Sequence, residues 1–87
     1  MSPKTYQLKI ITPKDVVYQG TVVSLIVPTE RGYVGALTDH APFTTTLSNG
    51  LVIIKSQGQE IRFQIGKGFL EILQNEARVL TESAVSV

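Results

Sequence analysis

The stretch LVIIKSQGQEIRFQI, residues 51–65, decides the fold class of this chain. Its second half alternates between apolar side chains, which we expect to point inward, and polar ones, which we expect to point outward: Ile61, Phe63 and Ile65 against Arg62 and Gln64. A period of two is typical of a β-strand with one buried face. The polar residues 56–59 include a glycine and separate this strand from the apolar residues 51–55. The stretch therefore predicts a β-hairpin.

Segments with strand character also lie on the N-terminal side of this hairpin. Residues 6–10 alternate with a period of two, and residues 22–27 are apolar on both faces. The second pattern predicts either a strand covered on both sides or a strand that crosses between two sheets. Residues 43–47 are prone to form a strand, whereas the glycines and prolines of residues 28–42 predict a loop-rich segment.

The C-terminal side of the hairpin continues the same pattern. The glycines of residues 66–68 predict a turn or a bulge, and residues 69–73 and 77–81 predict a second hairpin. We expect the last residues, 83–87, to fray. Turn signals recur every ~8–12 residues without a convincing amphipathic helix, which predicts an all-β sandwich or barrel. The length suits one domain, residues 1–87, because a chain of this size can bury roughly 60–65% of its surface in one core.

Composition and charge argue against several classes of protein. The eight basic residues are scattered and the net charge is +1, so the basic patch of a nucleic-acid binder or a polybasic membrane anchor is missing. The absence of cysteine excludes disulfides and thiolate catalysis. The N-terminus has no apolar signal region, and no apolar run approaches the ~20 residues that span a bilayer. We therefore expect a soluble, cytoplasmic protein that binds no nucleic acid.

Residues that could carry catalysis are few. His40 is the only histidine, and it follows Asp39 directly, so on a strand the two side chains would point to opposite faces. Gly66-Lys67-Gly68 lacks the earlier glycine and the following Ser or Thr of a phosphate-binding loop. Most carboxylates lie next to turns or at outward strand positions, as on a solvated surface. We therefore expect no catalytic residue, no metal site and no cofactor.

Motifs along nearly the whole chain resemble, in their order and spacing, the ε subunit of F-type ATP synthases. Tyr18-Gln19-Gly20 is similar to the family's aromatic-x-Gly motif. The sequence PTERGYVG, residues 28–35, is followed after four residues by His40-Ala41-Pro42, which is similar to the family's most diagnostic feature. Later motifs follow in the same order: Leu47-Ser48-Asn49-Gly50, GKGFLEI at residues 66–72, Asn75, and VLTESA at residues 79–84.

The resemblance implies a ten-stranded β-sandwich with a mechanical function. Such a domain is a non-catalytic part of the rotor stalk. It binds the γ subunit and the c-ring, reaches the α/β assembly through γ, and couples ion-driven rotation to ATP synthesis. It would lie at the cytoplasmic side of the inner (plasma) membrane, as a peripheral part of F1. The family's two-helix C-terminal domain would begin near Ala84, and this sequence stops soon after that residue. Inhibition of ATP hydrolysis and ATP binding by ε are therefore not carried over.

The resemblance also implies a surface that faces the c-ring. It consists of consecutive residues of one turn: Thr29, Glu30, Arg31, Gly32 and Tyr33. Glu30 and Arg31 would pair with polar loop residues of the ring, and Tyr33 would supply an aromatic anchor. The family often has an acidic residue at the position of Tyr33, so this chain departs from the family there.

A second implied surface faces the γ subunit. It consists of one segment, with the turn at Thr12 alongside it: Asp39, His40, Ala41, Pro42 and Phe43. His40 would orient this segment or form a hydrogen bond across the interface, and Pro42 would stiffen it. The glycines, Pro42 and His40 could instead only shape turns.

Two other functions stay open from the residues alone. A generic β-sandwich adaptor would recruit an extended peptide to an exposed edge strand, without preference for γ. A small enzyme would need a cleft with convergent polar groups and a perturbed titratable residue. A single histidine and no cysteine make the enzyme the poorer alternative.

Overall fold

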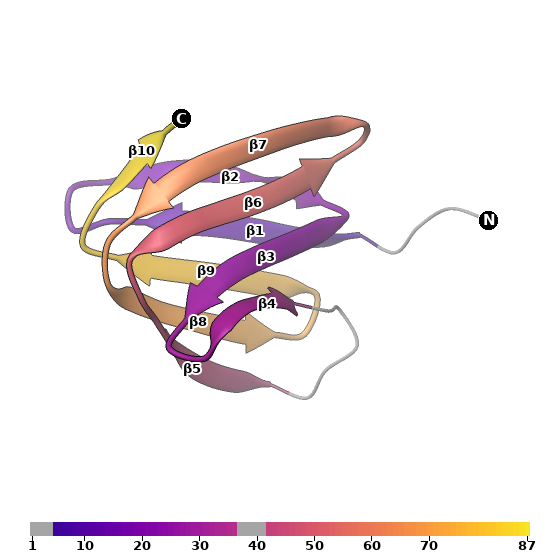
Figure 1. Ribbon diagram of the computed structural model, residues 1–87. Helices are drawn as coiled ribbons and strands as arrows, with labels where there is room; N and C mark the ends of the chain where they lie inside the picture. Colours follow the sequence, from indigo (N-terminus) through magenta and orange to yellow (C-terminus); the bar gives the residue numbers. More distant parts are fainter. Residues whose placement is uncertain (1–4, 37–41) are drawn as a thin grey trace.

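The computed structural model describes residues 5–36 and 42–87, and within these residues it contains ten β-strands and no helix (Figure 1). The all-β prediction is confirmed. The strands are β1 (Tyr6–Ile11), β2 (Val16–Val22), β3 (Ser24–Thr29), β4 (Gly32–Ala36), β5 (Phe43–Leu47), β6 (Gly50–Ser56), β7 (Gln59–Ile65), β8 (Gly68–Leu73), β9 (Glu76–Thr81) and β10 (Ala84–Ser86).

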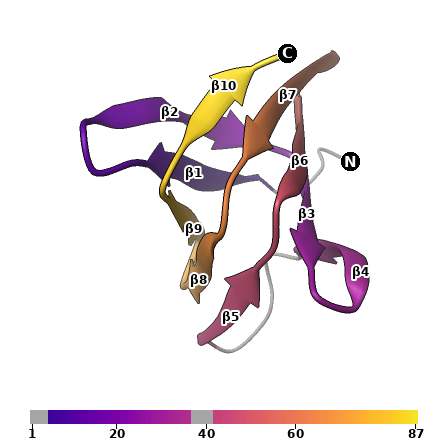
Figure 2. The same ribbon diagram turned by 60° about the vertical axis from the view of Figure 1, so that its left-hand side comes forward.

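The strands form two five-stranded sheets that pack face to face (Figure 2). Sheet A has the order β2-β1-β9-β8-β5, and sheet B has the order β10-β7-β6-β3-β4. Paired strands are antiparallel except β1 and β9, which run parallel. The ten-stranded β-sandwich implied by the resemblance is confirmed. Figures 1 and 2 both show β5 and β4, the last strands of their sheets, at one common edge of the sandwich.

The chain passes repeatedly from one sheet to the other. Val23 separates β2 in sheet A from β3 in sheet B. The stretch of residues 22–27 therefore spans this crossing: Val22 ends β2, and residues 24–27 belong to β3. Of the two alternatives for this stretch, the crossing between sheets is confirmed and the single covered strand is wrong.

The hairpin that decides the fold class forms as predicted. β6 and β7 pair from Gly50 and Ile65 to Ser56 and Gln59. Gln57 and Gly58 join them, with φ angles of 45° and 84°, which is the sign pattern of the type I′ turn that suits a twisted hairpin. Phe63 and Ile65 are buried, and Ile61 is half-buried against the core.

Two expectations about regular structure are wrong. In the described part of the segment predicted to be loop-rich, residues 28–36 are mostly strand, because β3 continues through Thr29 and β4 pairs back onto it. The described side chains of β4 are all exposed, so this edge strand has no apolar alternation by which to detect it. Residues 83–87 do not simply fray, because β10 pairs with β7 and the Val87 N–H donates to the Arg62 carbonyl at 3.1 Å.

The core fills the space between the two sheets with aliphatic side chains and few aromatic ones. Each fully buried Leu or Ile contributes about 1.5–3 kcal/mol relative to an exposed one. Tyr6 at the start of β1 is also buried, and burial raises the pKa of its phenol to about 12. The largest fully buried side chains are Leu8, Ile10, Leu25, Leu47, Ile54, Ile65, Val22, Val27, Val52 and Val79.

Two of the crossings between sheets are bonded to each other. We call residues 66–67, which join β7 to β8, and residues 82–83, which join β9 to β10, the paired crossings. The Gly66 N–H donates to the Ser83 carbonyl at 3.1 Å, and the Glu82 N–H donates to the Lys67 carbonyl at 3.2 Å. The buried Thr81 hydroxyl lies between them, 3.0 Å from both the Gly66 and Ser83 carbonyl oxygens. The glycine turn predicted at residues 66–68 is therefore one half of a packed junction.

Candidate functional site

The turn predicted to face the c-ring is a hairpin turn stabilised by its own side chains. We call residues 29–33 the 29–33 turn; it joins β3 to β4. The Thr29 hydroxyl donates to the Gly32 carbonyl at 2.7 Å and accepts the Arg31 N–H at 3.2 Å. Gly32 has a φ of 111°, a conformation that suits glycine. These bonds leave the side chains of Glu30 and Arg31 exposed at the tip.

Tyr33 is both exposed and attached to the body of sheet B. Its side chain is 56% exposed, yet its hydroxyl accepts the Leu51 N–H at 3.1 Å. Tyr33 pairs with Pro28, so its ring reaches from β4 past β3 to the start of β6. An added Cβ at Gly50 would lie 2.8 Å from Pro28 and 3.0 Å from the Tyr33 hydroxyl, so glycine leaves room for the ring. Tyr33 thus fixes β4, and with it the 29–33 turn.

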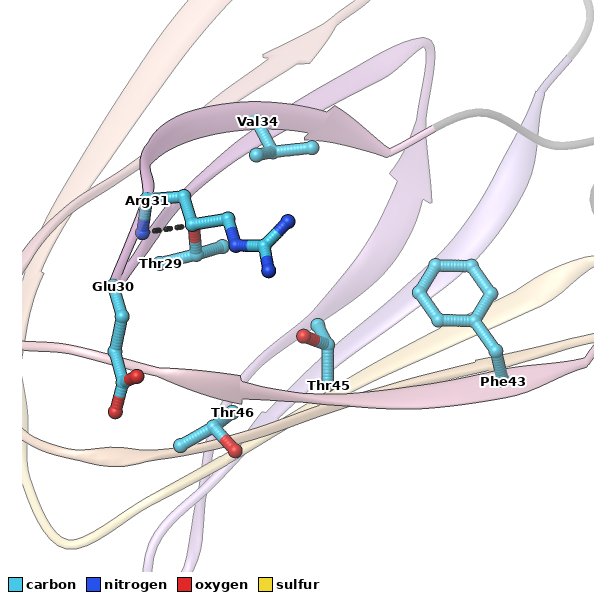
Figure 3. Close-up of a pocket in the computed structure, with 7 residues that line it drawn as sticks. All are labelled: Thr29, Glu30, Arg31, Val34, Phe43, Thr45 and Thr46. Carbon is cyan, nitrogen blue, oxygen red and sulfur yellow. Dashed lines mark hydrogen bonds between the residues drawn. The ribbon is translucent and has the colours of Figure 1, made fainter.

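A groove of about 420 Å³ lies at the common edge of the two sheets. One side comes from the 29–33 turn and β4, and the other from β5 (Figure 3). Figure 3 shows the Arg31 side chain extending over the groove in the direction of Phe43, and Glu30 also lines the groove. Apolar walls and hydroxyl groups complete the lining: Thr29, Val34, Phe43, Thr45 and Thr46.

The groove lining holds two charged side chains, Glu30 and Arg31. The other two arginines are paired, Arg62 with Glu60 and Arg78 with Glu71 and Glu76. Arg31 forms no ion pair with any residue in the described part of the chain. The guanidinium therefore offers its donors to solvent or to a bound molecule.

Only part of the surface predicted to face γ lies within the described residues. Asp39, His40 and Ala41 fall outside them, and Pro42 is exposed. Phe43 is 43% exposed and lines the groove together with Arg31. The structure thus brings Phe43 next to the 29–33 turn, so the two predicted surfaces are neighbours.

Thr12 does not lie alongside Phe43. Phe43 pairs with Ile72, which in turn pairs with Ala77 near the start of β9. Thr12 follows Ile11, which pairs with Leu80 near the end of β9. Thr12 also has a local role, because its N–H donates to the Asp15 carbonyl at 2.9 Å and so closes the turn between β1 and β2. The two positions lie toward opposite ends of the same sheet.

A row of apolar side chains was not identified from the sequence. Paired residues across sheet A place four of them side by side on its outer face: Val16, Ile11, Leu80 and Phe69. Val16 and Phe69 are 50% and 52% exposed. The row reaches Thr46 on β5, which pairs with Phe69. Each strand contributes one member, so the sequence carries no local signal for the row, and only the register reveals it.

Residues 5–36 and 42–87 hold no group of three or more His, Asp or Glu side chains placed to bind a metal ion. The same residues contain no helix long and apolar enough to cross a membrane.

Comparison with known proteins places residues 5–87 in one family model, described as the beta-sandwich domain of the ATP synthase delta/epsilon chain. An ATP synthase epsilon chain of Pelotomaculum thermopropionicum is 36% identical over 84 residues, which cover 97% of this chain and 63% of that protein. One of Caldanaerobacter subterraneus is 37% identical over 82 residues, covering 93% of this chain and 59% of that protein. The chain thus spans about three-fifths of the length of these relatives.

Solved structures support the same fold. A chain of the Euglena gracilis mitochondrial ATP synthase, in a structure of OSCP, F1 and c-ring, superposes with a TM-score of 0.88 at 21% identity, covering 97% of this chain and 54% of that one. A chain of the Tetrahymena thermophila mitochondrial ATP synthase central stalk and c-ring has a TM-score of 0.73 at 11% identity, covering 98% of this chain and 69% of that one. With the family model matched over residues 5–87, the chain belongs to the family of the ATP synthase delta/epsilon beta-sandwich domain.

Proposed function

We propose that this chain is a non-catalytic domain of the rotor stalk of an F1Fo ATP synthase, which binds the γ subunit and the c-ring and couples ion-driven rotation to ATP synthesis. The observation that carries the proposal is its match to ATP synthase epsilon chains over 97% of its length. The chain would reach the α/β assembly through γ and lie at the cytoplasmic side of the inner (plasma) membrane, held there by the complex.

The architecture suits a part that transmits torque. Every strand is bonded to at least one neighbour, and the core between the sheets is close-packed. Such interiors have low compressibility and transmit strain instead of absorbing it. The domain would therefore widen the foot of γ as a stiff body, and its function would depend on two surfaces and not on a reactive side chain.

The 29–33 turn is the surface that we assign to the c-ring. Its internal hydrogen bonds and the attachment of Tyr33 hold it in one shape, so Glu30 and Arg31 are presented with little loss of conformational freedom on binding. Polar loops of the ring would pair with these two charges. The exposed part of the Tyr33 ring would add apolar contact beside them.

The surface that we assign to γ includes Thr12 and residues 39–43. Because Thr12 and Phe43 lie toward opposite ends of sheet A, one partner that contacts both must cover much of that sheet. The apolar row from Val16 to Phe69 crosses the outer face at the level of Ile11, which Thr12 follows, and reaches β5 at Thr46. Exposed contiguous apolar side chains of this kind are typical of a surface that binds another protein.

Titration with the γ subunit of the same organism tests the proposal. We expect saturable one-to-one binding in a calorimeter, at least tenfold weaker for Phe69→Ser, because this change removes an aromatic anchor worth about 1.4 kcal/mol or more. Thr21→Ser, at another exposed position of sheet A, is the control and should bind like the parent chain. If γ does not bind although both partners are folded, the chain is better described as a β-sandwich adaptor for another protein.

Charge reversal in the 29–33 turn separates the c-ring surface from the fold. We expect Arg31→Glu to weaken association of the γ-bound chain with the c-ring by roughly tenfold, because repulsion would replace attraction at this position of the interface. The thermal midpoint should stay within about 4 °C of the parent value, since exposed substitutions change stability by less than about 0.5 kcal/mol. Arg62→Glu, on β7, is the matched control. Unchanged association with the ring would refute the assignment of this surface.

A further inference from the structure

The hairpin of β3 and β4 extends beyond the paired part of the sheet to which it belongs. β3 pairs with β6 from Ser24 to Ile26, whereas its pairing with β4 continues to Thr29. Within the described part of the chain, β4 has β3 as its only sheet neighbour. A two-stranded hairpin is at best marginally stable on its own. The shape of the projecting tip therefore depends on further contacts with the body of the domain.

Residues 48–51, which we call the 48–51 segment, supply such contacts. The Ser48 N–H donates to the Pro28 carbonyl at 3.0 Å, and the Leu51 N–H donates to the Tyr33 hydroxyl at 3.1 Å. Pro28 and Tyr33 pair with each other across the hairpin. The 48–51 segment thus bonds to both strands at one level, next to the tip that carries the exposed charges.

The fit between this segment and the hairpin depends on the glycine at residue 50. A Cβ at Gly50 would lie 2.8 Å from the Pro28 Cβ and 3.0 Å from the Tyr33 hydroxyl oxygen. Pro28 is buried and its ring is rigid, so it cannot turn aside as a flexible side chain would. A larger residue would therefore push the paired strands outward. This contact joins two motifs of the sequence, residues 47–50 and residues 28–35.

We infer that the Tyr33 hydroxyl and Gly50 position the contact with the c-ring without taking part in it. They hold the hairpin against the 48–51 segment and so fix the charged tip of the 29–33 turn before the ring binds. A turn that is already ordered loses less conformational freedom on binding than a mobile one. The inference rests on the proposed function, which assigns this turn to the ring. Loss of the hydroxyl should therefore weaken association with the ring although every charge of the turn is kept.

Tyr33→Phe tests the inference because it keeps the aromatic ring and removes only the hydroxyl. In the full chain without partners, NMR order parameters at Arg31 and Gly32 should be about 0.85, as in rigid backbone, and should fall toward about 0.6 in the variant. Exchange of the Leu51 N–H should become roughly threefold to tenfold faster, as expected for the loss of one neutral hydrogen bond. The matched control Tyr18→Phe removes a hydroxyl from β2, in the other sheet, and should change neither quantity.

Binding to the two partners separates positioning from a general loss of structure. We expect γ-bound Tyr33→Phe to associate with the c-ring roughly threefold to tenfold more weakly than the γ-bound parent chain, with unchanged affinity for γ. Gly50→Ala should weaken association with the ring as well. Equal order parameters in parent and Tyr33→Phe, equal association of the two with the ring, or an equal loss of affinity for γ would each overturn the inference. If the parent chain itself does not associate with the ring, the assignment of the turn fails, and the inference fails with it.

Discussion

Replacing Gly68 by alanine is expected to lower the free energy of unfolding by roughly 3 kcal/mol, near the upper end of what overpacking costs in a well-packed protein. Gly68 begins β8 and pairs with Thr81 of β9. A Cβ at this position would lie 2.0 Å from the Leu80 carbonyl oxygen and 2.8 Å from the Thr81 Cα. These are backbone atoms, so no change of rotamer can relieve the clash, and β9 itself must move away from β8.

A urea titration followed by circular dichroism measures this effect. For a domain of this size, a loss of 3 kcal/mol also lowers the thermal midpoint by roughly 12–24 °C. Gly35→Ala is the matched control, because Gly35 is also a strand glycine and the nearest atom to its added Cβ is the Leu25 carbonyl oxygen at 4.0 Å. We expect the control to change stability by less than about 0.5 kcal/mol. Equal midpoints for the two variants would show that β9 adapts without cost.

The displacement of β9 in Gly68→Ala should be transmitted to the paired crossings. Thr81 follows Leu80 directly, and its hydroxyl bonds to carbonyls on both connecting segments. A shift of β9 away from Gly68 therefore also lengthens these bonds. The glycine at residue 68, which could be interpreted from sequence as a bulge, is required because two strands and two crossings meet within contact distance there.

Strands with one buried face could be predicted from the sequence because burial imposes the period of two. Residues 61–65 show this, since Phe63 and Ile65 are buried and Arg62 is exposed. β4 could not be predicted, because its described side chains are all exposed and burial leaves no pattern in it. β10 could not be predicted either, because it holds three residues and its Val85 is 62% exposed.

The candidate surfaces could be predicted only as far as they are local in the chain. The 29–33 turn consists of consecutive residues, so its charges were identified directly. The groove joins that turn to Phe43 and Thr45, and the topology alone brings β4 and β5 to one edge. The turn at Thr12 was predicted to lie alongside residues 39–43, but the parallel pairing of β1 with β9 places Thr12 toward the end of sheet A opposite Phe43. Tyr33 shows that an exposed aromatic residue can also have a structural partner, here the Leu51 N–H.

Thr81→Val is expected to lower the free energy of unfolding by about 1–3 kcal/mol, because it leaves a buried carbonyl without a donor while almost conserving shape. The Thr81 side chain is 5% exposed, and its hydroxyl lies 3.0 Å from the Gly66 carbonyl oxygen, 3.2 Å from that of Lys67 and 3.0 Å from that of Ser83. One hydroxyl has one hydrogen, so it serves one carbonyl at a time. Lys67 and Ser83 also accept backbone N–H groups, so among the described contacts the Gly66 carbonyl depends most on Thr81.

Hydrogen exchange can locate this loss within the fold. In Thr81→Val we expect faster exchange of the Gly66 and Glu82 N–H groups, which bond across the paired crossings, and little change at the hairpin of β6 and β7. Thr81→Ser keeps the hydroxyl and removes only a methyl group, so it should lose about 1 kcal/mol and retain slow exchange at both amides. Thr44→Val, at an exposed position of β5, should leave stability nearly unchanged. If the serine variant proves the less stable of the two at position 81, the methyl group and not the hydroxyl holds the crossings together, and the hydrogen-bond account is wrong.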